Sequence, residues 1–194
     1  MIKSISYDQT EILSWIMELY CPNGFDVDPT FGRGGFYRDG RIPLPRFCSD
    51  MVPRFEHVLE RDCRNLRITD RVFWSVLFDP PFIHAPGKKS IIGNRFSGYP
   101  RQRDLHGLYY RSLEEFHRIL CPGGFVVFKC QDIVESGKQV WNHMIITVTA
   151  ERVGFALKDL FVLAAKHRIE GKNHGKQRHA RKFHSYFLVL VKDS

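Results

Sequence analysis

The stretch Arg71-Val72-Phe73-Trp74-Ser75-Val76-Leu77-Phe78-Asp79-Pro80-Pro81-Phe82 decides how the rest of the chain is interpreted. Its apolar part is short, rich in β-branched and aromatic residues and closed by two prolines, which predicts a buried strand over 72–78 and then a rigid turn. Proline favours extended backbone in the residue before it, so Asp79 is held just past the carboxyl end of the strand. Open α/β sheets bind ligands at that edge. By itself the tetrapeptide is also consistent with a purely structural turn.

Length and composition limit the class of protein. The 194 residues suffice for one domain with a sizeable core, and we expect a single domain over residues 1–194. Apolar residues make up 43% and charged residues 26%, which is typical of a soluble globular protein. The sequence has no apolar run near the roughly 20 residues that span a membrane, and its N-terminus lacks a signal-peptide core. We therefore expect a cytoplasmic protein that does not contact a membrane.

The cysteines and histidines do not predict a metal site. Five cysteines are widely spaced, without a Cys-x-x-Cys or zinc-ligand spacing, so we interpret them as small buried hydrophobes. His174, His179 and His184 recur at five-residue spacing, but their basic neighbours would repel a cation. We assign no metal.

The positive charge is concentrated in two segments. The chain has a net charge of +8. Residues 83–111 hold six Lys and Arg against one acid, and residues 166–182 hold seven against one acid. A nearly neutral body with two basic loops, 83–104 and 166–184, predicts a polyanionic partner. The candidate nucleic-acid contacts in these loops are Lys88, Lys89, Arg95, Arg101, Arg103, Lys176, Arg178, His179, Arg181 and Lys182. A solvated surface loop is the alternative.

Helical and extended segments alternate along the chain. We expect a helix over 8–20 with Asp8 as N-cap and Glu11 at the capping-box position, a short helix at 53–60, and helices at 105–120 and 140–153, the last with Trp141, Ile145, Val148 and Val153 on its apolar side. Expected strands lie at 25–28, 47–50, 72–78, 125–130, 155–165 and 185–191. This alternation predicts βαβ units and a mostly parallel sheet.

Two further acids follow predicted strands. Asp28 precedes a loop with three glycines in four positions, which lets backbone amides approach a ligand, although a plain turn is the alternative. Asp50 follows 22 residues later, at the spacing of an acid that accepts both hydroxyls of a ribose. Asp62 and Cys63 would lie at the end of a third strand beside the same pocket, where a carboxylate can accept from an adenine amino group; a solvated turn is the alternative for Asp62. Gln131 and Asp132 could line the target side of the pocket or simply cap a strand.

Three motifs in order resemble one family. Asp28-Pro29-Thr30-Phe31-Gly32-Arg33-Gly34-Gly35 is similar to the Asp-Pro-Phe-x-Gly-Ser-Gly-Thr loop of S-adenosylmethionine-dependent amino-methyltransferases, and Asp79-Pro80-Pro81-Phe82 matches their (Asp/Asn/Ser)-Pro-Pro-(Tyr/Phe/Trp) motif. The segment 116–125 resembles their Arg-Val-Leu-x-Pro-Gly-Gly bend. The likeness spans about residues 9–191. It departs at Thr30, where the family has an aromatic residue, and at Arg33, where it has a small one. The motif order excludes the permuted DNA-methyltransferase group.

The resemblance implies a fold and a set of roles. The fold would be class I (Rossmann-like) α/β, with a seven-stranded, mostly parallel sheet, an antiparallel last strand and helices on both faces. The cofactor would be S-adenosylmethionine, bound by Asp28, Pro29, Thr30, Gly32, Gly34, Asp50, Asp62 and Cys63. The catalytic residues would be Asp79, Pro80, Pro81 and Phe82, with the Asp79 carboxylate and the Pro80 carbonyl accepting from the target amine and Phe82 stacking on the base.

The expected activity is methylation of an exocyclic amine in DNA, at adenine N6 or cytosine N4, on a flipped base. An RNA N-methyltransferase for tRNA or rRNA is the alternative, because the same four residues serve there. A nucleic-acid-binding protein on a degenerate scaffold and a protein glutamine methyltransferase are further alternatives. Since no stretch is long enough for a separate recognition domain, specificity would come from the two basic loops or from a partner protein. The sequence does not determine the oligomeric state.

Overall fold

A computed structural model describes residues 1–82, 102–166 and 178–193. In these residues the strands are β1 (Ile5–Ser6), β2 (Val27–Asp28), β3 (Phe47–Asp50), β4 (Leu59–Glu60), β5 (Phe73–Phe78), β6 (Leu120–Cys130), β7 (Ile133–Glu135), β8 (Lys138–Val140), β9 (Phe155–Ala164) and β10 (His184–Lys192). The helices are α1 (Gln9–Tyr20), α3 (Gln102–Ile119) and α4 (Asn142–Val153). Of the predicted nucleic-acid contacts, Lys88, Lys89, Arg95, Arg101 and Lys176 lie outside the described residues.

The main sheet has the order β1-β9-β10-β6-β5-β2-β3-β4 in the described part of the chain. β10 runs antiparallel to both β6 and β9, and every other neighbouring pair is parallel. The predicted mostly parallel sheet with an antiparallel last strand is therefore confirmed. The described sheet contains one strand more than expected, because Ile5–Ser6 pairs with the end of β9. Two residues are too few to produce an alternating pattern in the sequence.

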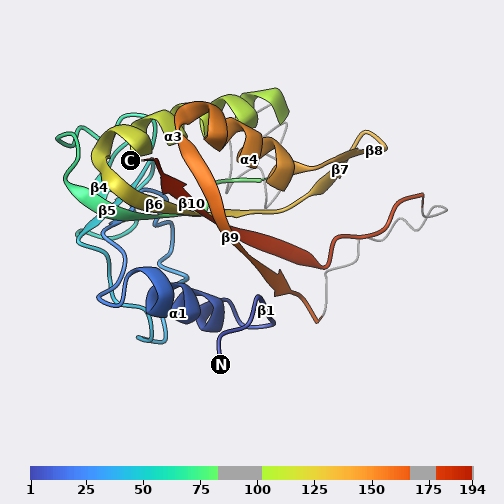
Figure 1. The fold of residues 1–194 in the computed structure, drawn as a ribbon, viewed down its shortest axis with the longest axis horizontal. Helices are drawn as coiled ribbons and strands as arrows, with labels where there is room; N and C mark the ends of the chain where they lie inside the picture. Colours follow the sequence, from blue (N-terminus) through green and yellow to red (C-terminus); the bar gives the residue numbers. More distant parts are fainter. Residues whose placement is uncertain (83–101, 167–177, 194) are drawn as a thin grey trace.

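Helices cover both faces of the sheet, with α1 on one face and α3 and α4 on the other (Figure 1). Alternate residues of the central strands separate into two cores, as the two-residue period of a strand requires. Val76 and Phe78 of β5 pack into the core that includes residues of α3 and α4, whereas Leu77 packs into the core that includes residues of α1. Because β5 is covered on both faces, it is an almost continuous apolar run rather than an alternating one.

The predicted ends of α1 and α3 follow their sequence signals. The Asp8 carboxylate accepts from the Thr10 amide at 2.8 Å and caps α1, as expected. Glu11 does not close a capping box and instead accepts from the Ser6 hydroxyl. After α3, Gly123 adopts a left-handed conformation with φ of 76°. A Cβ on Gly124 would lie 2.9 Å from the Cys121 carbonyl oxygen, so the bend requires glycine there.

One local prediction is wrong, and another is confirmed only in part. Residues 53–58 form turns and no helix, because Phe55 packs edge-on against Phe31 instead of belonging to a helical face. In α4, the fully buried side chains are Asn142, Ile146 and Ala150. Of the predicted apolar side, Trp141 and Val148 are exposed, whereas Val153 is partly buried and packs against the core. The hairpin β7–β8 between β6 and α4 was also not expected; it projects from the body of the molecule (Figure 1).

None of the helices in the described residues is both long and apolar enough to cross a membrane.

Candidate active site

The carboxyl ends of β2, β3 and β5 are tied together by one loop. Thr30 donates its amide to Asp28 Oδ1 at 2.9 Å, and its hydroxyl oxygen accepts from the Asp79 amide at 3.0 Å. The Gly32 amide donates to Asp50 Oδ2 at 2.8 Å. These three contacts bring Asp28, Asp50 and Asp79 to one edge of the sheet, so three of the predicted site acids share one site.

Asp28 is the buried acid of this group, with 1% of its surface exposed. Its Oδ2 accepts from the Tyr37 hydroxyl at 2.7 Å. Burial, together with the nearby charges of Asp79 and Asp50, outweighs the hydrogen bonds from Tyr37 and Thr30 and raises the pKa of Asp28 to about 7. Burial also raises the pKa of Tyr37, so its hydroxyl stays protonated and donates to Asp28. Such a carboxylate is suited to a cationic ligand, which would remove the cost of a buried negative charge.

Two glycines of the loop after β2 have a left-handed backbone conformation. Gly32 and Gly34 have φ values of 57° and 64°, in the left-handed region that favours glycine. A Cβ on Gly34 would also lie 3.1 Å from the ring of Phe31. Thr30 stands where the resembled family has an aromatic residue, and Phe31 supplies an aromatic ring one position later, stacked on Tyr37 at 5.2 Å between centroids.

The carboxylates beside the loop provide hydrogen-bond acceptors that fit the expected cofactor. Asp50 is half-buried at the end of β3 and accepts from the Val52 amide through its second oxygen, at 2.9 Å. Each oxygen of Asp50 keeps a further lone pair for a hydroxyl. Asp28 offers a buried anion for an ammonium group, and Asp50 offers acceptors for a ribose. Both features match the charges and hydroxyls of S-adenosylmethionine.

Asp62 and Cys63 are placed less favourably for the adenine role. The Asp62 carboxylate forms an ion pair with Arg64, which lowers its pKa. The Cys63 side chain is buried, with Sγ 3.3 Å from the Ser112 hydroxyl, and burial raises its pKa to about 11. The thiol is therefore neutral and turned into the core. Within the described residues, no hydrogen bond or ion pair connects these two side chains to Asp28, Asp50 or Asp79.

The Asp-Pro-Pro-Phe segment is held from α3 and from β6. The Tyr109 hydroxyl, on the buried face of α3, donates to the Pro81 carbonyl at 2.7 Å. The Lys129 ammonium, on β6, lies 3.1 Å from Asp79 Oδ2. Pro80 is buried, whereas Asp79, Pro81 and Phe82 are partly exposed. The carboxylate therefore faces the edge of the sheet with one oxygen paired.

Lys129 is a site residue that the sequence interpretation did not assign. Its ammonium lies over the rings of Phe36 and Phe187, 5.0 and 5.7 Å from their centroids, and only 14% of its side chain is exposed. A lysine inside the apolar strand run 125–130 was the available signal. Its partner could not be found from the sequence, because Asp79 lies fifty residues away.

The side chains at the end of β6 form a polar network. Asp132 is buried and accepts from the His143 amide and from His143 Nδ1, the latter at 2.8 Å. Tyr186 donates weakly to Asp132 at 3.4 Å, and its oxygen lies 2.8 Å from His184 Nε2. Burial, followed by the charge of Asp132, raises the pKa of Tyr186 to about 12. Asp132 is therefore a buried acceptor that fixes His143 and Tyr186, and it does not line the target side of the pocket.

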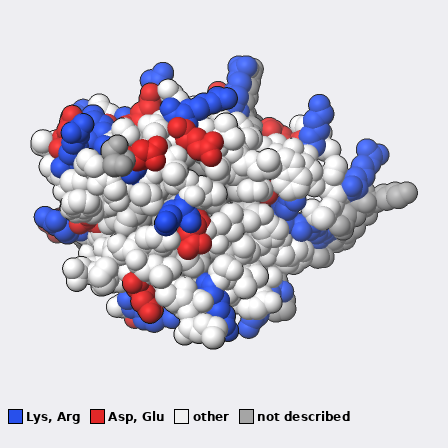
Figure 2. All heavy atoms as spheres, viewed as in Figure 1, with Lys and Arg blue, Asp and Glu red and all other residues white. Residues whose placement is uncertain are grey.

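The predicted basic contacts that the structure describes are spread around the β7–β8 hairpin and α3. Arg178 and Arg181 are exposed, His179 Nε2 lies 2.6 Å from the Gly137 carbonyl oxygen of the hairpin, and the buried Lys182 has its ammonium 4.4 Å above the Trp141 ring. Arg103 is on α3, 3.9 Å from Asp104. In the view of Figure 2, the charged side chains toward the hairpin end are mostly Lys and Arg, whereas both signs are mixed at the other end.

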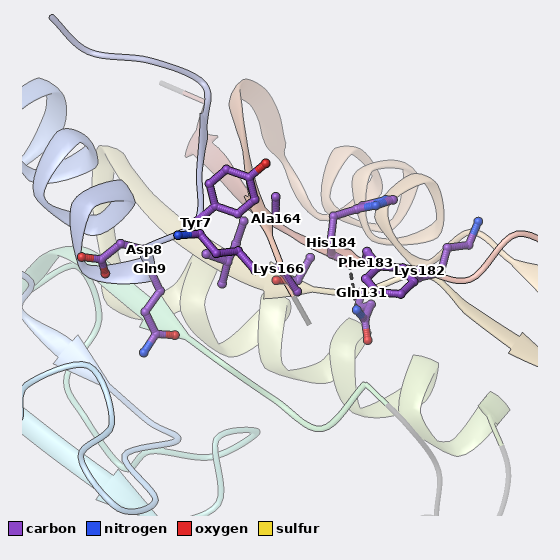
Figure 3. Close-up of a pocket in the computed structure, with 12 residues that line it drawn as sticks. Tyr7, Asp8, Gln9, Gln131, Ala164, Lys166, Lys182, Phe183 and His184 are labelled. Atoms are coloured by element: carbon purple, nitrogen blue, oxygen red, sulfur yellow. Dashed lines mark hydrogen bonds between the residues drawn. The ribbon is translucent and has the colours of Figure 1, made fainter. Parts of the chain in front are cut away.

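A pocket of about 560 Å³ opens at the same edge of the sheet, beyond β6. Tyr7 and Gln9 from the N-terminal segment, Gln131 after β6, and residues 163–166 and 182–185 line it (Figure 3). In the described residues, no group of three or more His, Cys, Asp and Glu side chains is arranged to hold a metal ion.

Solved structures that resemble this chain include proteins described as methyltransferases. TrmN from Thermus thermophilus is 16% identical, and the match covers 96% of this chain and 50% of that one with a TM-score of 0.55. A structure described as a candidate methyltransferase from Bacillus halodurans is 14% identical, with 94% and 99% covered and a TM-score of 0.56. A candidate DNA modification methylase, also from Thermus thermophilus and complexed with S-adenosyl-L-methionine, is 20% identical, with 69% and 54% covered and a TM-score of 0.49.

The first two matches establish that the chain has the class I, Rossmann-like methyltransferase fold. The chain spans about half the length of the first solved structures that it matches. No protein-family model and no curated protein matched the sequence.

Proposed function

We propose that the chain is an S-adenosylmethionine-dependent methyltransferase that methylates an exocyclic amino nitrogen of a base in DNA, adenine N6 or cytosine N4. The observation that carries the proposal is the loop 28–32, which hydrogen-bonds Asp28, Asp50 and the Asp79 backbone at one edge of the sheet. A cofactor-type acid pair and the Asp-Pro-Pro-Phe tetrapeptide are thereby neighbours. In open α/β sheets this edge is the binding edge.

The residues of the site would have separate roles in cofactor binding and methyl transfer. Asp28 would receive the ammonium of the cofactor, and Asp50 its ribose hydroxyls. When bound, the cofactor supplies a methyl group on a positively charged sulfur. Asp79 would accept a hydrogen bond from the target amine and stabilise the positive charge that develops on nitrogen during transfer. Phe82 would stack on the base, and Tyr109, through Pro81, would fix the tetrapeptide.

The Asp79–Lys129 pair bears on how the amine is held. The Lys129 ammonium donates to Oδ2 of Asp79. The target amine would therefore donate to the other oxygen of this carboxylate. A carboxylate fixed from one side presents its remaining lone pairs in one orientation. Placement of this kind contributes to catalysis without a covalent step.

The polymer and the methylated atom can be determined in one experiment. Wild-type protein is incubated with methyl-labelled S-adenosylmethionine and either DNA or total RNA, and the product is digested to nucleosides. The proposal expects label in N6-methyladenine or N4-methylcytosine from DNA. Label in a base-amino position of RNA alone would favour the RNA alternative, and label in neither polymer, with cofactor binding also absent by calorimetry, would favour the degenerate scaffold.

A further inference from the structure

The pocket beyond β6 is built from segments that are far apart in the sequence. Tyr7 precedes α1, Gln131 follows β6, Lys166 follows β9, and Phe183 and His184 lie at the start of β10. Because β10 runs antiparallel to the other strands, its first residues lie at the edge where the others end. The pocket is therefore on the same edge of the sheet as Asp79.

A short chain of side chains connects the pocket to Asp79. Gln9 lines the pocket, and its Oε1 lies 3.5 Å from Lys129 Nζ. The same ammonium is 3.1 Å from Asp79 Oδ2. Two side chains therefore separate the pocket from the carboxylate to which we assign the target amine.

The lining combines flat rings, amides and positive charge. The Tyr7 ring is 64% exposed and Phe183 is 36% exposed, while Leu163 and Ala164 add apolar surface between them. The Lys166 ammonium lies 5.4 Å from the centre of the Tyr7 ring, on one of its faces. Figure 3 shows Tyr7 with Lys166 on one side of the pocket, and Phe183 with His184 on the other.

The acid in the lining is paired within the protein, with an arginine that also pairs with Asp39. Asp8 Oδ2 lies 2.9 Å from the Arg41 guanidinium, and its other oxygen caps α1. The hydrogen bond from Arg41 lowers the pKa of Asp8. Lys166 is therefore the lysine whose ammonium contributes positive charge to the pocket. Lys182 lines it with its stem, because its ammonium lies over Trp141.

Gln131 and His184, which form the polar wall of the pocket, are fixed by hydrogen bonds to their neighbours. The Gln131 amide nitrogen donates to the His184 carbonyl at 2.8 Å, which leaves the Gln131 Oε1 as an acceptor. The His184 ring is fixed through Tyr186 and the buried Asp132. A wall anchored in this way presents its amide and imidazole in fixed positions.

We infer that this pocket binds a nucleotide of the substrate strand next to the one that is methylated, with its base on the exposed aromatic rings and its phosphate near Lys166. This inference rests on the proposed function. The volume of the pocket, about 560 Å³, lies within the usual range of ligand pockets, roughly 300–1,000 Å³. Exposed rings, amides and a lysine together are the elements that bind unstacked nucleotides.

The test measures the binding of a short, dye-labelled single-stranded oligonucleotide by fluorescence anisotropy, with DNA and RNA forms, to wild type, Tyr7→Ala and Lys166→Ala. We expect Tyr7→Ala to weaken binding about tenfold, the usual loss for one stacking ring. Lys166→Ala should weaken binding and reduce the slope of affinity against salt by a little under one, as expected for one lost phosphate contact to a single strand. Cofactor affinity should stay unchanged in both variants.

Matched controls stand at the opposite edge of the sheet. Trp74→Ala removes an exposed ring near the start of β5, and Lys158→Ala removes an exposed lysine near the start of β9. Neither control should alter oligonucleotide binding. Equal binding by wild type, Tyr7→Ala and Lys166→Ala would overturn the inference, as would an equal loss in the controls.

The outcome for the pocket is separable from the outcome for the proposed function. If wild type methylates a polynucleotide while the Tyr7 and Lys166 variants bind and react normally, the pocket assignment alone fails. If wild type binds the oligonucleotide in a Tyr7-dependent way but transfers no methyl group, the proposed activity fails, and the pocket is a nucleotide-binding site that does not serve methylation. If wild type methylates a peptide and the Tyr7 and Lys166 variants do not, the pocket belongs to a protein substrate and the inference of a nucleotide site is overturned.

Discussion

Asp28 combines almost complete burial with hydrogen bonds from Thr30 and Tyr37, and its pKa of about 7 makes it sensitive to pH near neutrality. The usual pKa of an aspartate is near 4. Below pH 7 the buried carboxyl is mostly protonated, so a cationic cofactor must displace a proton in order to bind. The charge state that the ligand needs is therefore fully present only above pH 7.

The affinity for S-adenosylmethionine should accordingly rise with pH. We expect the dissociation constant to fall by up to about tenfold per unit between about pH 5 and about pH 7, and then to level off. Isothermal titration calorimetry of wild type and Asp28→Asn would measure this. A flat profile in wild type, or the same slope in Asp28→Asn, would contradict the role of Asp28.

Lys129 acts through Asp79, and its test must separate positioning from folding. Lys129→Met keeps an apolar stem against Phe36 and Phe187 but removes the ammonium. We expect kcat to fall about tenfold, with cofactor affinity unchanged, because the carboxylate loses the contact that orients it. Lys129→Arg should restore much of the rate, and Lys138→Met on the hairpin should have no effect. A normal kcat in Lys129→Met would exclude a positioning role.

At the scale of elements, α3 is joined to the chain before β5 through Glu115. This buried carboxylate accepts from the Leu66 amide at 2.7 Å and from the Arg118 guanidinium through both of its oxygens. Arg118 also donates to the Ile68 carbonyl at 2.6 Å and pairs with Asp70. Glu115 raises the pKa of Arg118, which remains charged. The network fixes α3, which carries Tyr109 toward the Asp-Pro-Pro-Phe segment.

Removal of the Glu115 carboxylate should destabilise the fold. Glu115→Ala leaves a buried amide and part of a guanidinium without acceptors, so we expect the free energy of unfolding to fall by about 2 kcal/mol. Urea denaturation would measure it. The exposed neighbour Glu114→Ala should change stability by less than about 0.5 kcal/mol. Equal effects of the two substitutions would show that the network contributes nothing.

The elements differ in how far they can be predicted from the sequence. β3, β5 and β6 follow from apolar runs that end at acids, prolines or glycines, because these signals act within a few residues. β1 and β4 have two residues each and arise only from tertiary pairing. The buried face of α4 follows Asn142, Ile146 and Ala150, and α4 packs against α3 and β9. Its polar and small members, Asn142 and Ala150, give a weak hydrophobic signal in the sequence.

The site shows the same division. Asp28, Asp50 and Asp79 could be predicted because each comes directly at or after the end of a strand, and parallel strands end at a common edge. Lys129, Tyr37 and Tyr109 could not, since their roles depend on partners that only the folded chain brings near. The ion pair of Asp62 with Arg64, two residues away, was not expected, and the adenine role of Asp62 stays a prediction.

At the scale of the whole molecule, the sheet provides one functional edge. Its carboxyl end holds the proposed cofactor acids, the Asp-Pro-Pro-Phe segment and the pocket beyond β6, in that order across β3, β2, β5, β6 and β10. A nucleic-acid strand laid along this edge could place its target base at Asp79 and its neighbouring nucleotide in the pocket. The net charge of +8 favours such a polyanion.

In the proposed function, Asp79 receives the amine during methyl transfer at this edge. The most direct test of this role is the single-turnover rate of methyl transfer to a substrate oligonucleotide at saturating S-adenosylmethionine, compared between wild type, Asp79→Ala and the distant Asp193→Ala. We predict that Asp79→Ala lowers the rate at least about a hundredfold while cofactor affinity and the Asp193→Ala rate stay normal. An undiminished rate in Asp79→Ala would contradict the account.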